Sequence, residues 1–270
     1  MSAELNELAR LAADVRAVLE DGRLRGVRGE PTDAPLPEAI APPDGWLVQP
    51  DVEPAPVEAP SVLVDDWSQL ARRAREERPA SAVLLRRIRT DLGECRRCAL
   101  CRDRRNIVFG AGDEGADLLI IGEAPDYHED QKGEPFVGPA GEMLDKMLKH
   151  VLGLDRPQTY TLNTVKCRPP KNRQPLPAEL DACRPFLEGQ IDAIAPKVVL
   201  VLGSVALGVL FGADIGDITR NRGRWRMWRG VPVMPTFHPA YLLRQPQDKR
   251  RTFEDLKAVR TRYDELGGQR

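Results

Sequence analysis

Residues 117-DLLIIG-122 form a short apolar run that begins after an Asp and ends at a Gly. The run 197-KVVLVLG-203 has the same character. Continuous apolar runs of this length are typical of strands that are buried on both faces, as in a parallel sheet. Residues 160–165 and 231–237 have the composition of two further strands. We therefore expect four strands at the centre of the fold.

Predicted helices fall between and after these strands. Their ranges are 142–152, 177–194, 204–211 and 251–266. The alternation predicts an α/β protein, here a three-layer α/β/α fold with a four-stranded, mainly parallel sheet. Sites in such sheets lie at the carboxyl ends of the strands. In this chain those ends carry Gly122-Glu123, Asn163 and Phe237-His238.

The composition fits one sizeable domain with additional segments. The chain has 270 residues, of which 41% are hydrophobic. No run of 18 or more apolar residues is present, so we expect no membrane span. The N-terminus lacks the basic start and the apolar stretch of a signal peptide. We expect a cytoplasmic protein, in which the five cysteines are poor candidates for disulfides.

Charge divides the chain into two parts. Residues 1–66 hold 14 acidic and 5 basic residues, whereas residues 67–270 hold 27 acidic and 35 basic residues. A basic body with an acidic arm suits a polyanionic partner. The alternative is an arginine-rich composition whose charges are simply solvated, and charge alone does not decide between the two.

The N-terminal part is predicted to lie outside the main domain. Leucines and valines at near-helical spacing predict an amphipathic helix within residues 1–30. Residues 31–66 are acidic and rich in proline, so they are predicted to be a disordered linker. The main domain is expected to span residues 67–270 and to begin with a helix over 67–94.

The cysteines form a spaced set that suggests a metal site. Cys95, Cys98 and Cys101 are separated by two residues each, and Cys167 and Cys183 follow far along the chain. Four thiolates from two separated pairs suit a four-cysteine iron–sulfur cluster or a tetrahedral zinc ion. Unligated, reduced thiols are the alternative. One cysteine of the five is then spare, and we assign that place to Cys101.

The loop that leaves the first strand is rich in acids, glycine and proline. It reads 122-GEAPDYHEDQKGEPFVGPAGEMLD-145 and contains a single Phe. Such a composition does not suit a helix or a strand before Gly141. We expect this loop to line a crevice at the sheet edge, where polar side chains are useful.

Four motifs now agree with one known family. They are 122-GEAP-125, 135-PFVGPAGEMLD-145, 163-NTVKCRPPKNRQPLP-177 with Cys183, and 238-HPAYLLR-244. With these motifs, in this order, the chain resembles the family 4 uracil-DNA glycosylases, the iron–sulfur type. The resemblance covers roughly residues 90–266, and the N-terminal 90 residues lie outside it.

The resemblance implies a DNA repair glycosylase that flips uracil out of DNA and hydrolyses its N-glycosidic bond, leaving an abasic site. It also implies a [4Fe–4S] cluster held by Cys95, Cys98, Cys167 and Cys183. The expected substrate is uracil-containing DNA, single- or double-stranded, and the expected state is a monomer. The N-terminal arm is a candidate for binding a protein partner.

The resemblance also assigns roles to single residues. Glu123, Asn163 and His238 are the implied catalytic residues: Glu123 for the water, Asn163 for the uracil edge and His238 for the departing base. Phe136 is expected to stack on uracil, with Ala124 and Glu129 lining the pocket, and Glu129 placed where the methyl group of thymine would fall. The residues expected to enter the minor groove are Tyr241, Leu242 and Arg244.

Two departures from the family pattern are relevant. Asp126 stands where the family usually has Gly, and Tyr127-His128 is unusual. An extra carboxylate is expected to crowd the water site or repel phosphate. Residues 171–182 lack the basic, His-containing insert of relatives that crosslink to uracil, so covalent trapping of DNA is not expected. A non-catalytic or altered-specificity iron–sulfur DNA-binding protein is the alternative, and an assay of uracil release would decide.

Overall fold

The computed structural model describes residues 78–269. The helix predicted within residues 1–30 and the linker predicted over residues 31–66 lie outside this range, and so does the predicted start of the main domain at residue 67. The domain boundaries therefore stay predictions. The first described helix, α3, spans Arg78–Leu92.

The sheet has six strands in the order β1-β3-β2-β4-β6-β5. The four central strands are parallel to one another, as predicted, and the outer strands β1 and β5 are antiparallel to their neighbours. The bounds are β1 (Ala111–Gly112), β2 (Leu118–Gly122), β3 (Tyr160–Asn163), β4 (Val198–Leu202), β5 (Arg226–Trp228) and β6 (Val231–Thr236). The predicted α/β class is confirmed, but the strand number of four was wrong. The two edge strands have two and three residues and no fully buried residue, so they carry no apolar run.

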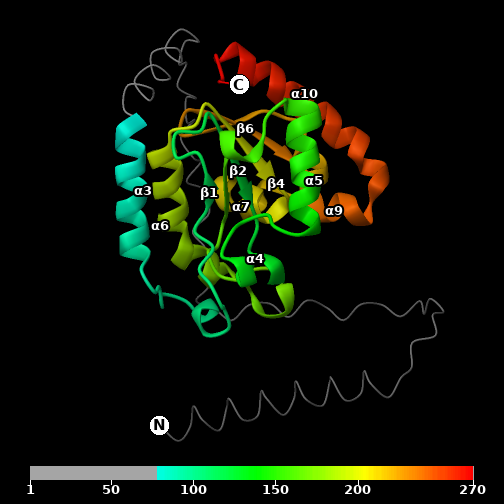
Figure 1. Ribbon diagram of the computed structural model, residues 1–270. Coiled ribbons are helices and arrows are strands. Elements are labelled where there is room, and N and C mark those ends of the chain that lie inside the picture. Colours follow the sequence, from blue (N-terminus) through cyan, green and yellow to red (C-terminus); the bar gives the residue numbers. More distant parts are fainter. Residues whose placement is uncertain (1–77, 270) are drawn as a thin grey trace, which may run out of the picture. The chain divides into compact units, whose positions relative to one another are not determined.

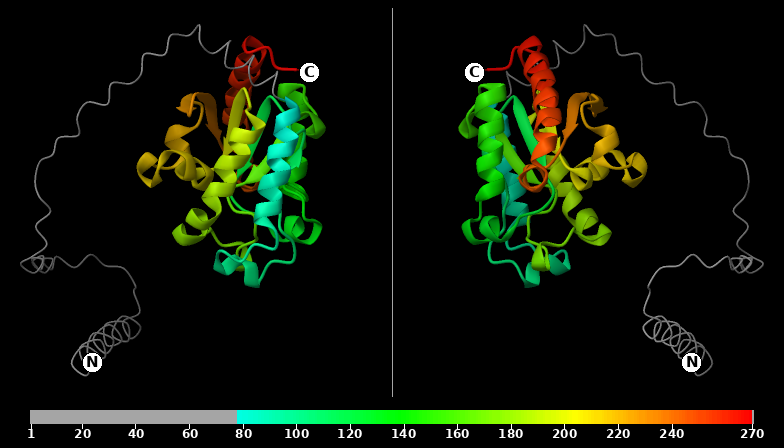
Figure 2. Two further views of the ribbon diagram at one scale, coloured as in Figure 1. Left: turned by 90° about the vertical axis from the view of Figure 1, so that its left-hand side faces the viewer. Right: turned by 90° about the vertical axis from the view of Figure 1, so that its right-hand side faces the viewer.

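Helices cover both faces of the sheet, as Figures 1 and 2 show. In both figures, α3 and α6 lie side by side on one face, and α5 and α10 lie on the other. After α3, the helices are α4 (Tyr127–Lys132), α5 (Pro139–Met147), α6 (Pro177–Ile194), α7 (Ser204–Phe211), α8 (Ile218–Asn221), α9 (Pro239–Arg244) and α10 (Lys249–Glu265). Short helical turns occupy Ala99–Arg102, Leu148–Leu152, Arg156–Gln158, Pro170–Asn172, Ala213–Ile215 and Pro246–Asp248. None of the helices in residues 78–269 is both long and apolar enough to cross a membrane.

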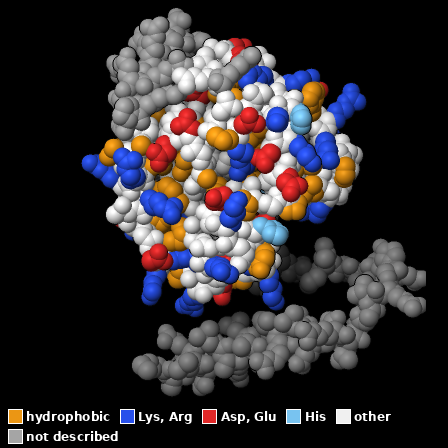
Figure 3. Space-filling view, viewed as in Figure 1, with side chains coloured by type: hydrophobic (Ala, Val, Ile, Leu, Met, Phe, Trp, Pro, Cys, Tyr) orange, Lys and Arg blue, Asp and Glu red, His pale blue; other side chains and the backbone are white. Residues whose placement is uncertain are grey.

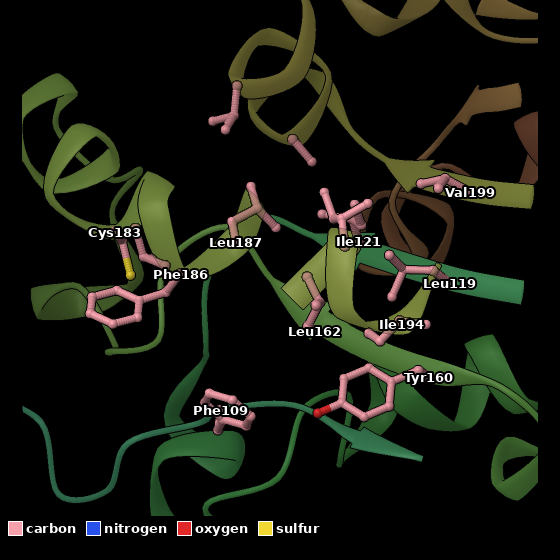
Figure 4. Packing of buried hydrophobic residues seen from close by; sticks show 14 of the residues in the cluster. Phe109, Leu119, Ile121, Tyr160, Leu162, Cys183, Phe186, Leu187, Ile194 and Val199 are labelled. Atoms are coloured by element: carbon pink, nitrogen blue, oxygen red, sulfur yellow. The ribbon is translucent and has the colours of Figure 1, made fainter. Parts of the chain in front are cut away.

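Strand β2 shows how the sequence builds two cores. All five of its residues are buried. Because successive side chains of a strand point to opposite faces, Leu119 and Ile121 enter the core under α3 and α6, which Figure 4 shows, whereas Leu118 and Ile120 enter the core under α5 and α10. A strand that is apolar on both faces is thereby fixed at the centre of the sheet.

The sheet register brings two loops together at one edge. Gly122 at the end of β2 pairs with Asn163 at the end of β3. Glu123 and the acid-rich loop leave the sheet at this point, and His238 follows β6 two strands away. The carboxyl edge therefore carries the polar residues that the sequence placed there.

Candidate active site

The floor of the site is formed by Gly122, Phe136 and Asn163. A Cβ atom on Gly122 would lie 2.4 Å from Asn163 Oδ1 and 2.5 Å from Phe136 Cζ, so only glycine leaves room for both side chains. The Phe136 ring also lies beside the His238 ring, with the centroids 5.6 Å apart and the planes 31° apart. Three of the residues expected at the base pocket are thus brought together.

Phe136 has a left-handed backbone with φ of 53°, which is costly for a residue with a side chain. Its N–H donates to the buried carboxylate of Glu129, and its carbonyl group packs where a Cβ on Gly141 would be, 1.8 Å away. The Arg156 guanidinium donates to the Pro135 carbonyl at 2.8 Å. These contacts hold the aromatic ring in place before any ligand arrives.

Glu129 anchors the loop from inside α4. Its carboxylate also accepts a hydrogen bond from the Asp126 N–H at 2.6 Å. Burial raises the pKa of Glu129 to about 7, opposed by the two backbone hydrogen bonds and by the nearby Asn163 amide. The sequence assigned Glu129 only to the pocket wall, and its contacts give it a backbone-holding role that the sequence did not indicate.

Asp126 is the N-cap of α4. Its side chain accepts a hydrogen bond from the Glu129 N–H at 2.9 Å, so Asp126 and Glu129 form a reciprocal capping box. The expectation that this carboxylate crowds a water site assumed that it points into the crevice. The structure instead uses it to satisfy a helix N–H group.

Glu123 has a carboxylate that makes no hydrogen bond or ion pair with any residue that the structure describes. The residue is half-buried, and burial raises the pKa of its carboxyl group. Its backbone carbonyl accepts a hydrogen bond from the Thr164 hydroxyl, which ties the end of β2 to the end of β3. The position of Glu123 is therefore fixed while its charged end stays free.

His238 begins α9 as its N-cap. Its Nδ1 accepts a hydrogen bond from the Ala240 N–H at 3.2 Å, so we assign the proton of the neutral ring to Nε2. The residue is partly buried. This burial, with a smaller contribution from Arg244, lowers the pKa of His238 to about 4. The ring is thus a neutral hydrogen-bond donor near pH 7.

Asn163 is buried, and its Nδ2 atom has no hydrogen-bond partner among residues 78–269. It lies close enough to Glu129 to affect the pKa of that carboxyl group, although the two form no hydrogen bond of full geometry. Leaving a buried donor unpaired costs about 1–3 kcal/mol. The Asn163 amide therefore has a buried donor that a ligand can satisfy.

The α9 residues differ from expectation at one position. Leu242 is only 1% exposed and belongs to the core under α5 and α10, so its assignment to the DNA groove stays a prediction that this burial does not favour. The helix turns Leu243 outward instead, at 43% exposure, and Arg244 is also exposed. Tyr241 stacks on Phe237 at 4.8 Å and donates its hydroxyl hydrogen to Asp248 at 2.6 Å. Ala124 is partly buried against the core under α3 and α6.

Four of the five cysteines belong to that core or pack against it, and we call this region the cysteine corner. Cys167 and Cys183 are buried in it, and Cys95 and Cys98 pack against it, whereas Cys101 does not belong to it. Figure 4 shows Cys183 beside Phe186. Arg104 donates to Cys167 Sγ at 3.3 Å and to the Cys95 carbonyl at 2.7 Å. As placed, no three Cys, His, Asp or Glu side chains in the described range form a group that could hold a metal ion.

Lys166 links this corner to the sheet edge, and the sequence indicated a basic residue near the cysteines but not its burial. The side chain is 1% exposed, and its ammonium group donates to the Asn163 carbonyl at 2.7 Å. Burial lowers the pKa of Lys166 to about 8, opposed by Cys183 and Cys167. A buried cation needs nearby negative charge. Four thiolates around an iron–sulfur cluster would supply it, so the residue types, although not their present placement, suit such a group.

Comparison with known proteins places the chain among the uracil DNA glycosylases. The model of the uracil DNA glycosylase superfamily matches residues 109–257. The chain is 40% identical to a type-4 uracil-DNA glycosylase of Sulfurisphaera tokodaii over 183 residues. The aligned residues cover 65% of this chain and 83% of the relative. It is 39% identical to that of Archaeoglobus fulgidus, over 63% of this chain and 88% of the relative. The type-4 uracil-DNA glycosylase of Thermotoga maritima is 40% identical, over 62% of this chain and 88% of the relative.

Proposed function

The chain belongs to the type-4 branch of the uracil DNA glycosylase superfamily, and from this we propose that it excises uracil from DNA in base excision repair. The reaction hydrolyses the bond between uracil and deoxyribose and leaves an abasic site. The observation that carries the proposal is the unpaired amide of Asn163, buried beside the preset ring of Phe136.

Uracil recognition follows from this pair of residues. The nucleotide must leave the duplex stack, and a buried aromatic face compensates for the lost stacking. Phe136 supplies that face. Asn163 offers an acceptor and a donor on one amide, which match the N3–H donor and the O4 acceptor of uracil. Lys166 holds Asn163 in position by donating a hydrogen bond to its backbone carbonyl. Glu129 holds Phe136 in position by accepting a hydrogen bond from its backbone N–H.

Bond cleavage uses His238 and Glu123. The electron pair of the glycosidic bond leaves with uracil, and the sugar becomes an oxocarbenium-like cation. His238 donates a hydrogen bond from Nε2 to uracil O2, where negative charge grows. Glu123 stabilises the cation and orients the water that adds to C1′. The raised pKa of Glu123 suits it to accept the proton that this water loses.

A [4Fe–4S] cluster would be held by Cys95, Cys98, Cys167 and Cys183. When bound, it would supply negative charge and a covalent tie among their loops. Aerobically purified protein should then contain iron and be brown, and Cys101→Ser should retain the iron while Cys98→Ser loses it. A colourless protein with stoichiometric zinc would contradict this assignment, as would the opposite order of the two variants.

The test of the proposed function is uracil release. Purified protein is incubated with single-stranded and double-stranded oligonucleotides that contain one uracil, and with thymine-containing controls. We expect free uracil and an abasic site from both uracil substrates and none from the controls. Binding without release would instead support a non-catalytic DNA-binding protein. Asp126, one of the departures from the family pattern, has a structural role as a helix cap.

The remaining assignments concern assembly. We propose that the enzyme acts as a monomer, and that the acidic N-terminal arm recruits a protein partner and is not required for excision. Deletion of residues 1–77 should leave single-turnover excision near wild type. Loss of excision by a shortened protein that stays folded would contradict this.

A further inference from the structure

Tyr127 presents an aromatic ring to solvent at the edge of the site. The residue is 51% exposed, and its hydroxyl makes no hydrogen bond with the part of the chain that the structure describes. The Arg168 guanidinium lies over the ring, with its central carbon 5.2 Å from the ring centroid. The His128 ring meets it edge-on, at 5.7 Å and 80°. One aromatic face is therefore backed by a cation while much of the ring stays open.

Contacts around Tyr127 hold this arrangement in place. Arg168 Nε donates to Asn172 Oδ1 at 2.7 Å. Lys171 and Asn172 both have left-handed backbones, with φ of 55° and 54°, and strained loops of this kind are concentrated at binding sites. His128 packs on the Phe136 loop, since a Cβ on Gly138 would lie 3.2 Å from its ring. The exposed ring is thus connected to the uracil pocket through packed side chains.

The position of Tyr127 places it beside the route of a bound DNA strand. It follows Glu123 by four residues, so the two Cα atoms are at most about 14 Å apart. Arg168 likewise follows Asn163 closely in the chain. Figure 3 shows Lys and Arg side chains gathered at the lower end of the molecule, where Figure 1 places α4. Such a basic surface suits the phosphates of a strand whose uridine enters the pocket.

We propose that Tyr127 and Arg168 form a stacking site for an unpaired nucleobase one or two nucleotides from the excised uridine. This proposal rests on the proposed function. Aromatic rings flanked by arginine bind single-stranded bases of any sequence, because every base has a π face. In an intact duplex the neighbouring bases are paired and stacked on each other. The site therefore favours uracil in single-stranded or locally opened DNA.

The experiment measures binding without cleavage. The probe is an oligonucleotide with 2′-fluoro-2′-deoxyuridine, whose fluorine destabilises the cation required for cleavage, and with 2-aminopurine at each of the two flanking positions on either side in turn. Stacking on Tyr127 quenches the 2-aminopurine fluorescence at one of these positions. We expect Tyr127→Ala to abolish the quenching and to weaken single-strand binding by about fivefold to tenfold, the lower part of the range for one stacked base. Duplex binding should change less than twofold.

Two further variants test the mechanism. Tyr127→Phe keeps the ring and should match wild type, whereas a loss as large as that of Tyr127→Ala would mean that the hydroxyl binds phosphate and would overturn the proposal. Phe253→Ala is the matched control, because Phe253, on α10, is 44% exposed and has Lys257 at 5.1 Å from its ring centroid. It should leave the quenching and the affinity unchanged.

An abasic spacer at the quenched position completes the test. On that oligonucleotide wild type and Tyr127→Ala should bind equally, since no base is present to stack. Equal binding of the two proteins to the unspaced probe, with unchanged quenching, would overturn the stacking site. Uracil release by wild type from the unmodified oligonucleotide is measured in parallel. Its absence would contradict the proposed function and not the stacking site, so the two failures are distinguishable.

Discussion

Strand β2 has an acidic residue at each end, and the two are treated in opposite ways. Asp117, just before the strand, is buried, pairs with Lys197 at 3.2 Å and accepts a hydrogen bond from the Gln269 N–H at 3.0 Å. Glu123, just after the strand, has a carboxylate without a partner among the described residues. The same strand therefore ends in a satisfied charge on one side and a free charge on the other.

The two ends of β2 therefore have different roles. The amino end stabilises the fold, and the carboxyl end carries the groups proposed for catalysis. At the amino edge, burial of a paired charge fastens β2, β4 and the C-terminal segment to one another. At the carboxyl edge, Glu123, the Asn163 amide and the left-handed Phe136 all remain in states that cost free energy without a ligand. Proteins retain such destabilising features at functional sites, where interactions with a bound substrate offset them.

The largest expected effect is on cleavage at the carboxyl edge. Glu123→Gln and His238→Ala should each lower the single-turnover rate of uracil release by about 100- to 1,000-fold, because each removes one electrostatic contact to the transition state. Binding of uncleavable DNA should persist. If either variant unfolds at the same urea concentration as wild type and also cleaves at the wild-type rate, then the changed residue has no catalytic role.

The next effect belongs to the amino edge and should appear in stability alone. Lys197→Ala leaves Asp117 buried without its cation, which should lower the free energy of unfolding by about 3 kcal/mol. Urea denaturation measures this change, and single-turnover assays at low temperature should give the wild-type rate. A slowed reaction in a protein of wild-type stability would show that the two edges are coupled.

The sequence predicted the parts of this comparison that depend on a single segment. The apolar runs of β2 and β4 and the helices over residues 177–194 and 204–211 occur as predicted. Polar residues directly after strands were also expected at a shared edge, because parallel strands end on one side of a sheet.

Features that depend on contacts between segments were not predictable in this way. Leu242 and Leu243 are adjacent and chemically identical, and only the packing of α9 on α5 decides which is buried. Lys166 is normally a surface residue type, and its burial depends on the cysteine corner. The bond from Glu129 to the Phe136 N–H closes a loop whose shape no periodicity encodes.

A pH-dependent effect of intermediate size should arise at the carboxyl edge. The folded-state pKa of His238, about 4, lies below the ordinary value of 6.5, so the unfolded chain binds a proton in this interval and the folded protein does not. Stability is therefore lost as pH falls below about 6.5. Between pH 7 and 4.5 the loss should reach about 2 kcal/mol.

This contribution is isolated by subtracting the urea stability of His238→Asn from that of wild type at each pH. The subtraction removes the opposite trend of Glu129, whose raised pKa makes stability fall as pH rises from about 4.5 to 7. A difference that does not change with pH would mean that the His238 ring is exposed in solution.

A smaller effect is expected on α9. Leu243→Ala should slow single-turnover release from duplex DNA by about fivefold, because an exposed apolar side chain can fill the gap left by a flipped base. Release from single-stranded DNA should not change, since no stacked gap forms there. Met227→Ala on β5, which also removes an exposed apolar side chain, is the control. Equal slowing on both substrates would assign Leu243 another role.

The smallest effect should come from Asp126, the departure from the family pattern. Its carboxylate caps α4 through the Glu129 N–H, and glycine also serves well as an N-cap. Asp126→Gly should therefore lower the free energy of unfolding by only a few tenths of a kcal/mol. The rate of uracil release should stay within about twofold of wild type or rise slightly, because a negative charge near the DNA phosphates is removed. If Asp126→Gly abolishes cleavage while Glu123→Gln does not, then Asp126 acts on the sugar cation, and the free carboxylate at the end of β2 is not the catalytic acid.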